Sequence, residues 1–202
     1  MARPPRFDVD QLLDAAVRRA AASGPTGVTM SAVAKDVGAP SGSVYHRFPG
    51  RPALLAEVWL RTVAGFQEGY LQALGADVDP QRAARAAARH VIAWSRAHPD
   101  EAALLLYGAE DFGRTEWSEE HRCRADLGNQ RVYAALAALA AALGVKGPGA
   151  AECIALALVE LPLASVRRHL RAGQPLPAHA EELAEQCAGA LLDGLLAGEI
   201  AV

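Results

Sequence analysis

Two very short helices separated by a tight turn constrain this 202-residue chain more than any other feature. Thr29 can cap the first helix at its N-terminus, and Gly38 can take the left-handed conformation that ends it. Pro40 keeps Ala39 out of helical geometry, so the second helix begins after the turn, at Ser41. Helices this short are not stable in isolation and must pack on neighbouring helices. Their order and spacing are those of a helix-turn-helix.

The rest of the chain is also predicted to be helical. Alanine and leucine dominate, alternating β-branched runs are absent, and proline and glycine breaks leave about nine helical pieces. We therefore predict an all-α fold, with a three-helix helix-turn-helix domain over residues 1–52 and a larger helical domain over 53–202. Pro162 is expected to kink its helix. The predicted helices cover residues 8–23, 29–38, 41–48, 52–74, 80–98, 100–111, 118–143, 150–171 and 178–198.

Composition limits the class of protein. Hydrophobic residues make up 51% of the chain and charged residues 21%, which suits a folded core. The N-terminus lacks the apolar segment of a signal peptide, and the apolar runs are shorter than a membrane span, so we expect a cytoplasmic protein. Cys123, Cys153 and Cys187 have no metal-ligand or disulfide spacing, and we expect them to be buried as small hydrophobic residues.

Charge is distributed unevenly between the two ends of the chain. Residues 1–51 hold seven basic and four acidic side chains, a net charge of +3, although the whole chain carries −3. The remainder holds 13 basic and 19 acidic residues, a net charge of −6. A basic head on an acidic body would attract nucleic-acid phosphates at one end only, although an asymmetry of this size also arises by chance.

The outward side of the second short helix is polar and begins with small residues. Small residues let a backbone approach a DNA groove closely, and a helix N-terminus favours phosphate. This mixture suits a recognition helix in the major groove, while an ordinary helical hairpin with a polar surface fits it as well. The outward residues are Ser41, Gly42, Ser43, Tyr45, His46 and Arg47.

The stretch TMSAVAKDVGAPSGSVYHRFPGRPALL, residues 29–55, closely resembles the DNA-binding signature of the TetR family of transcriptional regulators. The shared features are a threonine opening the second helix, alanine and glycine near the turn, a serine-led recognition helix, and Tyr45 followed by Phe48. A basic residue and leucines then open the fourth helix, and the resemblance covers about residues 7–55. It implies a homodimeric DNA-binding regulator, most often a repressor, which a small apolar or aromatic effector releases from a palindromic operator.

The resemblance also implies roles for single residues. Thr29, Tyr45, His46 and Arg51 correspond to phosphate contacts, and Ser41, Gly42 and Ser43 to the residues nearest the base edges. Arg51 departs from the usual lysine, which keeps the charge but adds a bidentate fork, and Pro52 departs from an often polar residue. Lys35 and Arg47 are either further backbone contacts or solvated surface charges.

Aromatic residues indicate how the larger domain is used. Large rings can line a concave apolar pocket, whereas helices of alanine, leucine and glycine pack closely, and core packing of the rings is the alternative. By the resemblance, the chamber would lie among helices four to seven and the dimer interface on the last two. The candidate pocket residues are Trp59, Phe66, Tyr70, Trp94, Tyr107, Phe112, Trp117 and Tyr133, and the candidate interface residues are Leu156, Val159, Leu163, Leu183, Cys187, Leu191 and Leu195.

Other functions find weaker support in the sequence. There is no nucleophile–base motif, phosphate loop or glycine fingerprint, so we expect neither an enzyme nor a bound cofactor. His121 and Cys123, with Glu119 and Glu120, are conceivable metal ligands, but two side chains at this spacing on a helix point apart. A DNA-binding protein that answers to a protein partner instead of a ligand is a further alternative.

Overall fold

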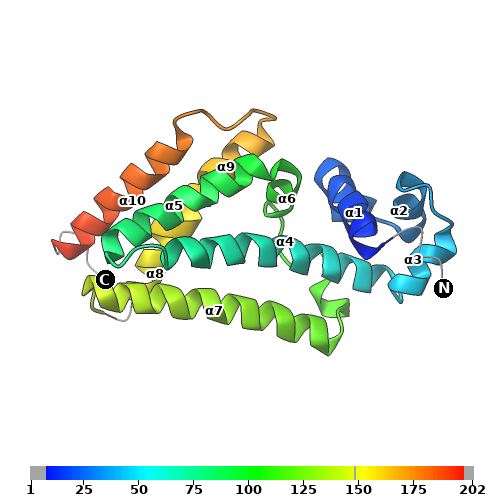
Figure 1. Cartoon of the computed structure of the whole chain (residues 1–202), viewed down its shortest axis with the longest axis horizontal. Coiled ribbons are helices and arrows are strands. Elements are labelled where there is room, and N and C mark those ends of the chain that lie inside the picture. Colours follow the sequence, from blue (N-terminus) through cyan, green and yellow to red (C-terminus); the bar gives the residue numbers. More distant parts are fainter. Residues whose placement is uncertain (1–7, 148, 198–202) are drawn as a thin grey trace, which may run out of the picture. The chain divides into compact units, whose positions relative to one another are not determined.

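The computed structural model describes residues 8–147 and 149–197, and within them it contains helices and turns but no β-strand (Figure 1). This confirms the all-α prediction. The chain divides into two compact units. The first comprises Met1–Val63 and Ala103–Ala125, and the second comprises Ala64–Ala102 and Asp126–Val202. The first unit is larger than the predicted DNA-binding segment, and the functional division at residue 52 stays a prediction.

None of the helices in the described part of the chain is long and apolar enough to cross a membrane.

In the first unit, α1 (Val9–Ser23) begins and ends where the sequence predicts. The carboxylate of Asp8 accepts a hydrogen bond from the backbone N–H of Gln11 at 2.8 Å, which satisfies a donor of the first turn. Gly24 ends the helix with a φ of +70°, a conformation that glycine takes without steric cost. The buried face of α1 consists of Leu12, Leu13, Ala15, Ala16, Val17 and Ala20.

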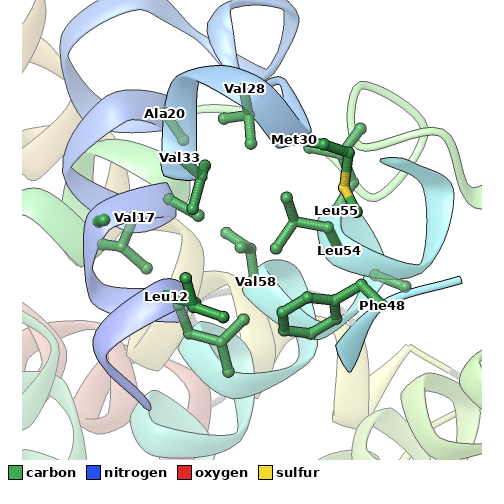
Figure 2. Packing of buried hydrophobic residues seen from close by; sticks show 14 of the residues in the cluster. Leu12, Val17, Ala20, Val28, Met30, Val33, Phe48, Leu54, Leu55 and Val58 are labelled. Atoms are coloured by element: carbon green, nitrogen blue, oxygen red, sulfur yellow. The ribbon is translucent and has the colours of Figure 1, made fainter. Parts of the chain in front are cut away.

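Three further helices complete the core of this unit: α2 (Met30–Asp36), α3 (Ser41–Arg47) and the first turns of α4 (Arg51–Leu74). Figure 2 shows Val33, Phe48 and Leu54 directed toward the same core as the side chains of α1. Burying one such side chain contributes about 1.5–3 kcal/mol. Their joint burial explains why α2 and α3 are stable despite having seven residues each.

In the second unit, α5 (Pro80–Ala97) and α10 (Ala180–Leu196) pack closely through small residues. Ala84 and Ala88 of α5 and Ala188 of α10 are fully buried. Arg89 of α5 also forms ion pairs with two carboxylates of α10, Glu181 at 2.8 Å and Glu185 at 3.3 Å. The long α7 (Glu119–Leu143) adds Leu136, Leu139, Ala140 and Leu143 to the same core.

The segment between α5 and α7 departs from the predicted helices. A helix was expected over residues 100–111, whereas α6 covers only Pro99–Leu104, and turns and a short 3-10 helix (Arg114–Glu116) follow as far as Trp117. The indole N–H of Trp117 donates to the backbone oxygen of Phe112 at 2.9 Å, and both rings are buried in the core of the first unit. Tertiary packing therefore determines this segment in place of local helix propensity.

The single helix predicted over residues 150–171 consists of three pieces: α8 (Ala150–Ala155), a π-helical turn (Leu156–Glu160) and α9 (Leu161–Arg171). Pro162 lies directly after the π turn and has no backbone N–H to donate to the preceding turn. The wider turn accommodates the missing hydrogen bond at the position where the sequence predicts a kink.

The cysteine prediction was wrong in part. Cys123 and Cys187 are exposed and Cys153 is partly buried, and all three are free thiols.

Candidate nucleic-acid interface

The turn between α2 and α3 has the geometry that the sequence predicts. Thr29 Oγ1 accepts a hydrogen bond from the backbone N–H of Ala32 at 3.2 Å and so caps α2. Gly38 has a φ of +67°, and the backbone N–H of Ala39 donates to Ala34 O at 2.9 Å, which closes the helix end. Pro40 then has an extended ψ of 139°, and α3 begins at the next residue.

The two helices share a buried inner face. Val33 of α2 and Val44 of α3 have no exposed surface, and Phe48, at the end of α3, is 4% exposed. Phe48 lies beside Leu12, Leu54 and other core residues contributed by α1 and α4 (Figure 2). This packing fixes the orientation of α3. Val44 is the one buried side chain of Ser41–Arg47, and rotating the helix would expose it.

The opposite face of α3 is open. Tyr45 is 58% exposed, and Ser41, Gly42 and His46 are also exposed, while Ser43 and Arg47 are partly buried. A Cβ atom built on Gly42 would have no atom of the described chain within 4 Å, so nothing covers the backbone at this position. The predicted base-reading and phosphate-binding residues of α3 therefore lie together on one accessible helix that begins with small side chains.

An ion pair that the sequence analysis did not identify holds α2 against α1. Arg19 Nε and Nη2 donate to the two carboxylate oxygens of Asp36 at 2.8 and 2.7 Å. Hydrogen bonding from Arg19 holds the pKa of Asp36 below its ordinary value. The partners are 17 residues apart, so no local sequence pattern connects them. The pair fixes the helix that carries Thr29 and Lys35, both of which are exposed.

Arg51, a predicted phosphate contact, is turned partly into the protein. Its Nε donates to Val28 O at 2.8 Å and its Nη2 donates to Pro25 O at 2.9 Å. Both carbonyls belong to the loop immediately before Thr29. Arg51 therefore braces the start of α2 with two of its three guanidinium nitrogens, although the residue as a whole is exposed.

A second polar cluster in the first unit connects α7 with α4. Glu57 of α4 contacts His121 Nε2 at 3.1 Å and Arg124 Nη1 at 2.5 Å, and His121 Nδ1 lies 2.7 Å from Ser118 Oγ. Burial opposes ionisation of Glu57, but hydrogen bonds and charge from Arg124 and His121 outweigh it and lower the pKa of Glu57. The sequence of contacts from Ser118 through His121 to Glu57 resembles a hydrolase triad. Ser118 Oγ, however, also accepts a hydrogen bond from the backbone N–H of His121 at 3.3 Å and so caps the start of α7. We therefore assign the cluster a structural role.

Among the described residues, no three or more His, Cys, Asp or Glu side chains lie together in a way that could hold a metal ion.

The predicted pocket residues do not form one group. Trp59, Tyr107, Phe112 and Trp117 belong to the core of the first unit, where the rings of Trp59 and Phe112 lie 5.1 Å apart. Phe66, Tyr70 and Trp94 form a separate cluster in the second unit. Tyr133, on α7, is 66% exposed. Their assignment to a ligand pocket stays a prediction.

The predicted interface residues lie on the π turn, α9 and α10. Leu156 and Leu183 are 48% and 49% exposed, and Cys187 is exposed. Val159, Leu163 and Leu191 are partly buried, whereas Leu195 is 9% exposed and belongs to the core. An apolar hollow of about 50 Å³ lies on this surface and is lined by Cys153, Leu156, Ala157, Leu191 and Leu195.

Comparison with known proteins agrees with the helix-turn-helix. Residues 12–58 match the sequence model of the family described as bacterial regulatory proteins, tetR family. No curated protein sequence matches the chain.

Solved structures extend the similarity to the whole chain. A transcriptional regulator from Rhodococcus sp. Rha1 is 25% identical, with a TM-score of 0.64 over 95% of this chain and 97% of that one. A TetR-family regulator from Marinobacter aquaeolei VT8 is 16% identical, with a TM-score of 0.72 over 90% and 93% of the two chains. FadR from Bacillus subtilis, solved in complex with stearoyl-CoA, is 14% identical, with a TM-score of 0.69 over 95% and 99%.

Proposed function

This chain carries the DNA-binding domain of the tetR family of bacterial regulatory proteins, and from this we propose that it is a transcriptional repressor. A small, largely apolar effector would release it from a palindromic operator. The observation that carries the proposal is the helix-turn-helix, in which a buried inner face holds α3 while its small and hydrogen-bonding side chains stay exposed. We further propose that the protein acts in the cytoplasm, where such an operator would be found.

In the proposed complex, α3 enters the major groove with its N-terminal residues toward the bases. Ser41, Gly42 and Ser43 would approach base edges, and Tyr45 and His46 would reach phosphates. The Thr29 hydroxyl accepts the capping hydrogen bond and lies 3.4 Å from Ser31 Oγ, so it could donate to a phosphate where Ser31 acts as the donor of that pair. Lys35 and Arg47 would add phosphate contacts beside them.

A palindromic operator requires two such heads, and we propose a homodimer formed through α8, the π turn, α9 and α10. Leu156, which lines the apolar hollow, and Leu183 support this, because large apolar side chains exposed to this degree are typical of a surface covered by a partner. Two-fold symmetry would place the recognition helices about 34–36 Å apart, one turn of DNA.

Effector control would then be a coupling between two binding equilibria. A ligand that favours a dimer conformation with mis-spaced heads lowers operator affinity, and the operator lowers ligand affinity by the same factor. The helix α4 includes residues of both compact units and is the element that we propose transmits the change. FadR from Bacillus subtilis, a structural neighbour, was solved in complex with stearoyl-CoA, so a chain of this fold can hold a ligand with a long apolar tail.

The test is binding to the intergenic DNA upstream of the gene, measured by fluorescence anisotropy over a salt series with scrambled DNA as control. We expect tight, sequence-selective binding that weakens steeply with salt, because phosphate contacts release counterions. Tyr45→Phe should weaken binding with little change in the salt slope, because a neutral hydroxyl releases no counterion, whereas Tyr133→Phe, at an exposed tyrosine of α7, should leave the affinity unchanged. Absence of binding to both DNAs at low salt would contradict the proposal.

A further inference from the structure

The segment between α6 and α7 is part of the first compact unit, although it lies within the larger domain predicted over residues 53–202. Ala103–Ala125 group with Met1–Val63, whereas the residues on either side of this segment belong to the second unit. Leu104, Phe112 and Trp117 of the segment are buried in the same core as α1 and α2. The unit that carries the helix-turn-helix therefore includes a piece of chain that is distant in sequence.

Tyr107 of this segment contacts the loop that leads into α2. A Cβ atom built on Gly24 would lie 3.0 Å from the hydroxyl oxygen of Tyr107 and 3.6 Å from its Cζ, and the three nearest atoms all belong to Tyr107. Gly24 also has a φ of +70°, which a residue with a Cβ adopts only under strain. The tip of the tyrosine ring thus lies over a glycine that both the backbone and the ring require.

The Tyr107 ring is held in place by other rings of the core. It meets the Phe112 ring edge to face with centroids 6.3 Å apart, and the Phe112 ring lies 5.1 Å from that of Trp59 on α4. Phe112 has no exposed surface, and its backbone oxygen accepts the indole N–H of Trp117 at 2.9 Å. A closely packed core leaves little space for such rings to shift, so the position of Tyr107 is well defined.

The loop before α2 is consequently fixed by two side chains that are distant in sequence. Arg51 donates to two of its carbonyls, and Tyr107 covers Gly24 at its start. The side chain of Val28, at its end, is directed into the core (Figure 2). The next residue is Thr29, whose hydroxyl caps α2. The placement of α2 therefore depends on how this loop is held.

We propose that Tyr107 is a positioning residue for operator binding, because it fixes the loop that places Thr29 and α2. Tyr107 acts through the backbone of this loop and does not itself contact DNA. The inference rests on the proposed function, since operator affinity is the property that the placement of α2 affects. It also means that residues 1–52 alone lack a contact on which the DNA-binding domain depends.

Operator affinity of full-length variants, measured by fluorescence anisotropy, tests this role. Tyr107→Ala removes the ring and should weaken binding at least about fivefold, roughly the effect of losing one helix cap. Its salt slope should stay unchanged, because no charged contact is lost. Tyr107→Phe keeps the ring carbons that lie over Gly24 and should bind like the unaltered chain. Since Tyr107 is only partly buried, Tyr107→Ala should still fold, which its Tm checks.

Val58→Ala is the matched control for a general loss of stability. Val58 is fully buried in the core of the same unit and belongs neither to the loop nor to the segment that carries Tyr107. Its truncation should lower the Tm but leave operator affinity unchanged.

Hydrogen exchange without DNA separates this proposal from the proposed function. In Tyr107→Ala the backbone amide of Ala32, which donates to Thr29, should exchange faster than in the unaltered protein, whereas Tyr107→Phe and Val58→Ala should leave it unchanged. If exchange changes in this way but the unaltered chain binds no operator, the repressor proposal fails and the role of Tyr107 in placing α2 stands. Unchanged exchange of Ala32 in Tyr107→Ala would overturn the proposal. So would operator affinity that Tyr107→Ala leaves unaltered, or that Val58→Ala or Tyr107→Phe lowers equally.

Discussion

At the scale of single residues, Arg51 shows how a predicted contact acquires a second role. Its position at the start of α4 matches the basic residue of the TetR signature, yet Nε and Nη2 donate to Val28 O and Pro25 O. The loop that these carbonyls belong to leads directly into Thr29, so we propose that Arg51 would influence DNA binding both through its charge and through the position of α2.

Substituting Arg51 by lysine and by alanine separates these two roles. If the hydrogen bonds to Val28 O and Pro25 O matter most, Arg51→Lys should lose nearly as much operator affinity as Arg51→Ala. A lysine ammonium cannot donate to both carbonyls with the fork geometry of a guanidinium. If phosphate contact dominates, lysine should restore both affinity and the salt slope. Anisotropy over a salt series decides between them, and Arg131→Ala on α7 is the control for general loss of charge.

Glu57 makes the stability of the first unit depend on pH. Its pKa is lowered in the folded protein from an ordinary value of 4.5, so its contribution is present above about that pH and is lost as the pH falls through the folded value. Glu57→Gln should therefore lower the free energy of unfolding at pH 7, by roughly 1 kcal/mol, and by less at pH 3. Urea denaturation at both pH values measures this, with the exposed Glu160→Gln as control. An equal penalty at both pH values would contradict it.

At the scale of elements, the α2–α3 turn depends on backbone geometry that only particular residues adopt. Gly38 takes a φ of +67°, whereas Gly42 lies within α3 and has open space where a Cβ would project. The fold of the turn thus requires glycine at position 38, whereas nothing within the fold requires it at position 42, where we propose that DNA approaches the backbone.

Alanine substitutions at the two glycines should have opposite effects. Gly38→Ala should destabilise the protein by about 1 kcal/mol, because a Cβ is strained at positive φ. Gly42→Ala should leave the Tm unchanged or raise it, since alanine is the better helix former, yet it should weaken operator binding by placing a methyl group against the groove. Thermal unfolding and anisotropy on both variants test the pair. Unaltered operator affinity in Gly42→Ala would remove Gly42 from the interface.

At the scale of the whole molecule, the exposed leucines of α10 and the π turn bear on assembly. Leu183 and Leu156 remain about half exposed after the chain has folded, although another face of α10 is packed on α5 through buried Ala184 and Ala188. Their exposure is costly in water, and the proposed homodimer would remove it.

Charge introduced on this surface should therefore split the dimer. The double variant Leu156→Glu and Leu183→Glu is expected to sediment as a monomer in analytical ultracentrifugation, and its operator affinity should fall at least a hundredfold, because one head cannot bind both half-sites. Leu127→Glu, at a leucine of α7 that is 57% exposed, is the matched control and should remain dimeric. A dimer that survives the double substitution would refute the assigned interface.

Local signals in the sequence determined the all-α class, the caps at Asp8 and Thr29, the helix end at Gly38 and the break at Pro40, all of which the structure confirms. They did so because caps, positive φ and proline act over a few residues, where sequence and geometry are directly connected. The outward residues of α3 followed from the same short-range pattern.

Only the tertiary structure decided which distant residues meet. It pairs Arg19 with Asp36, directs Arg51 to the loop before α2, and ends α6 at Leu104 so that Phe112 and Trp117 reach the core. It also separates the aromatic residues into different clusters and leaves Tyr70 without a hydrogen-bond partner among the described residues. These outcomes depend on the packing of helices far apart in the chain, and packing selects partners by shape and volume across the whole core, which no local pattern of residues encodes.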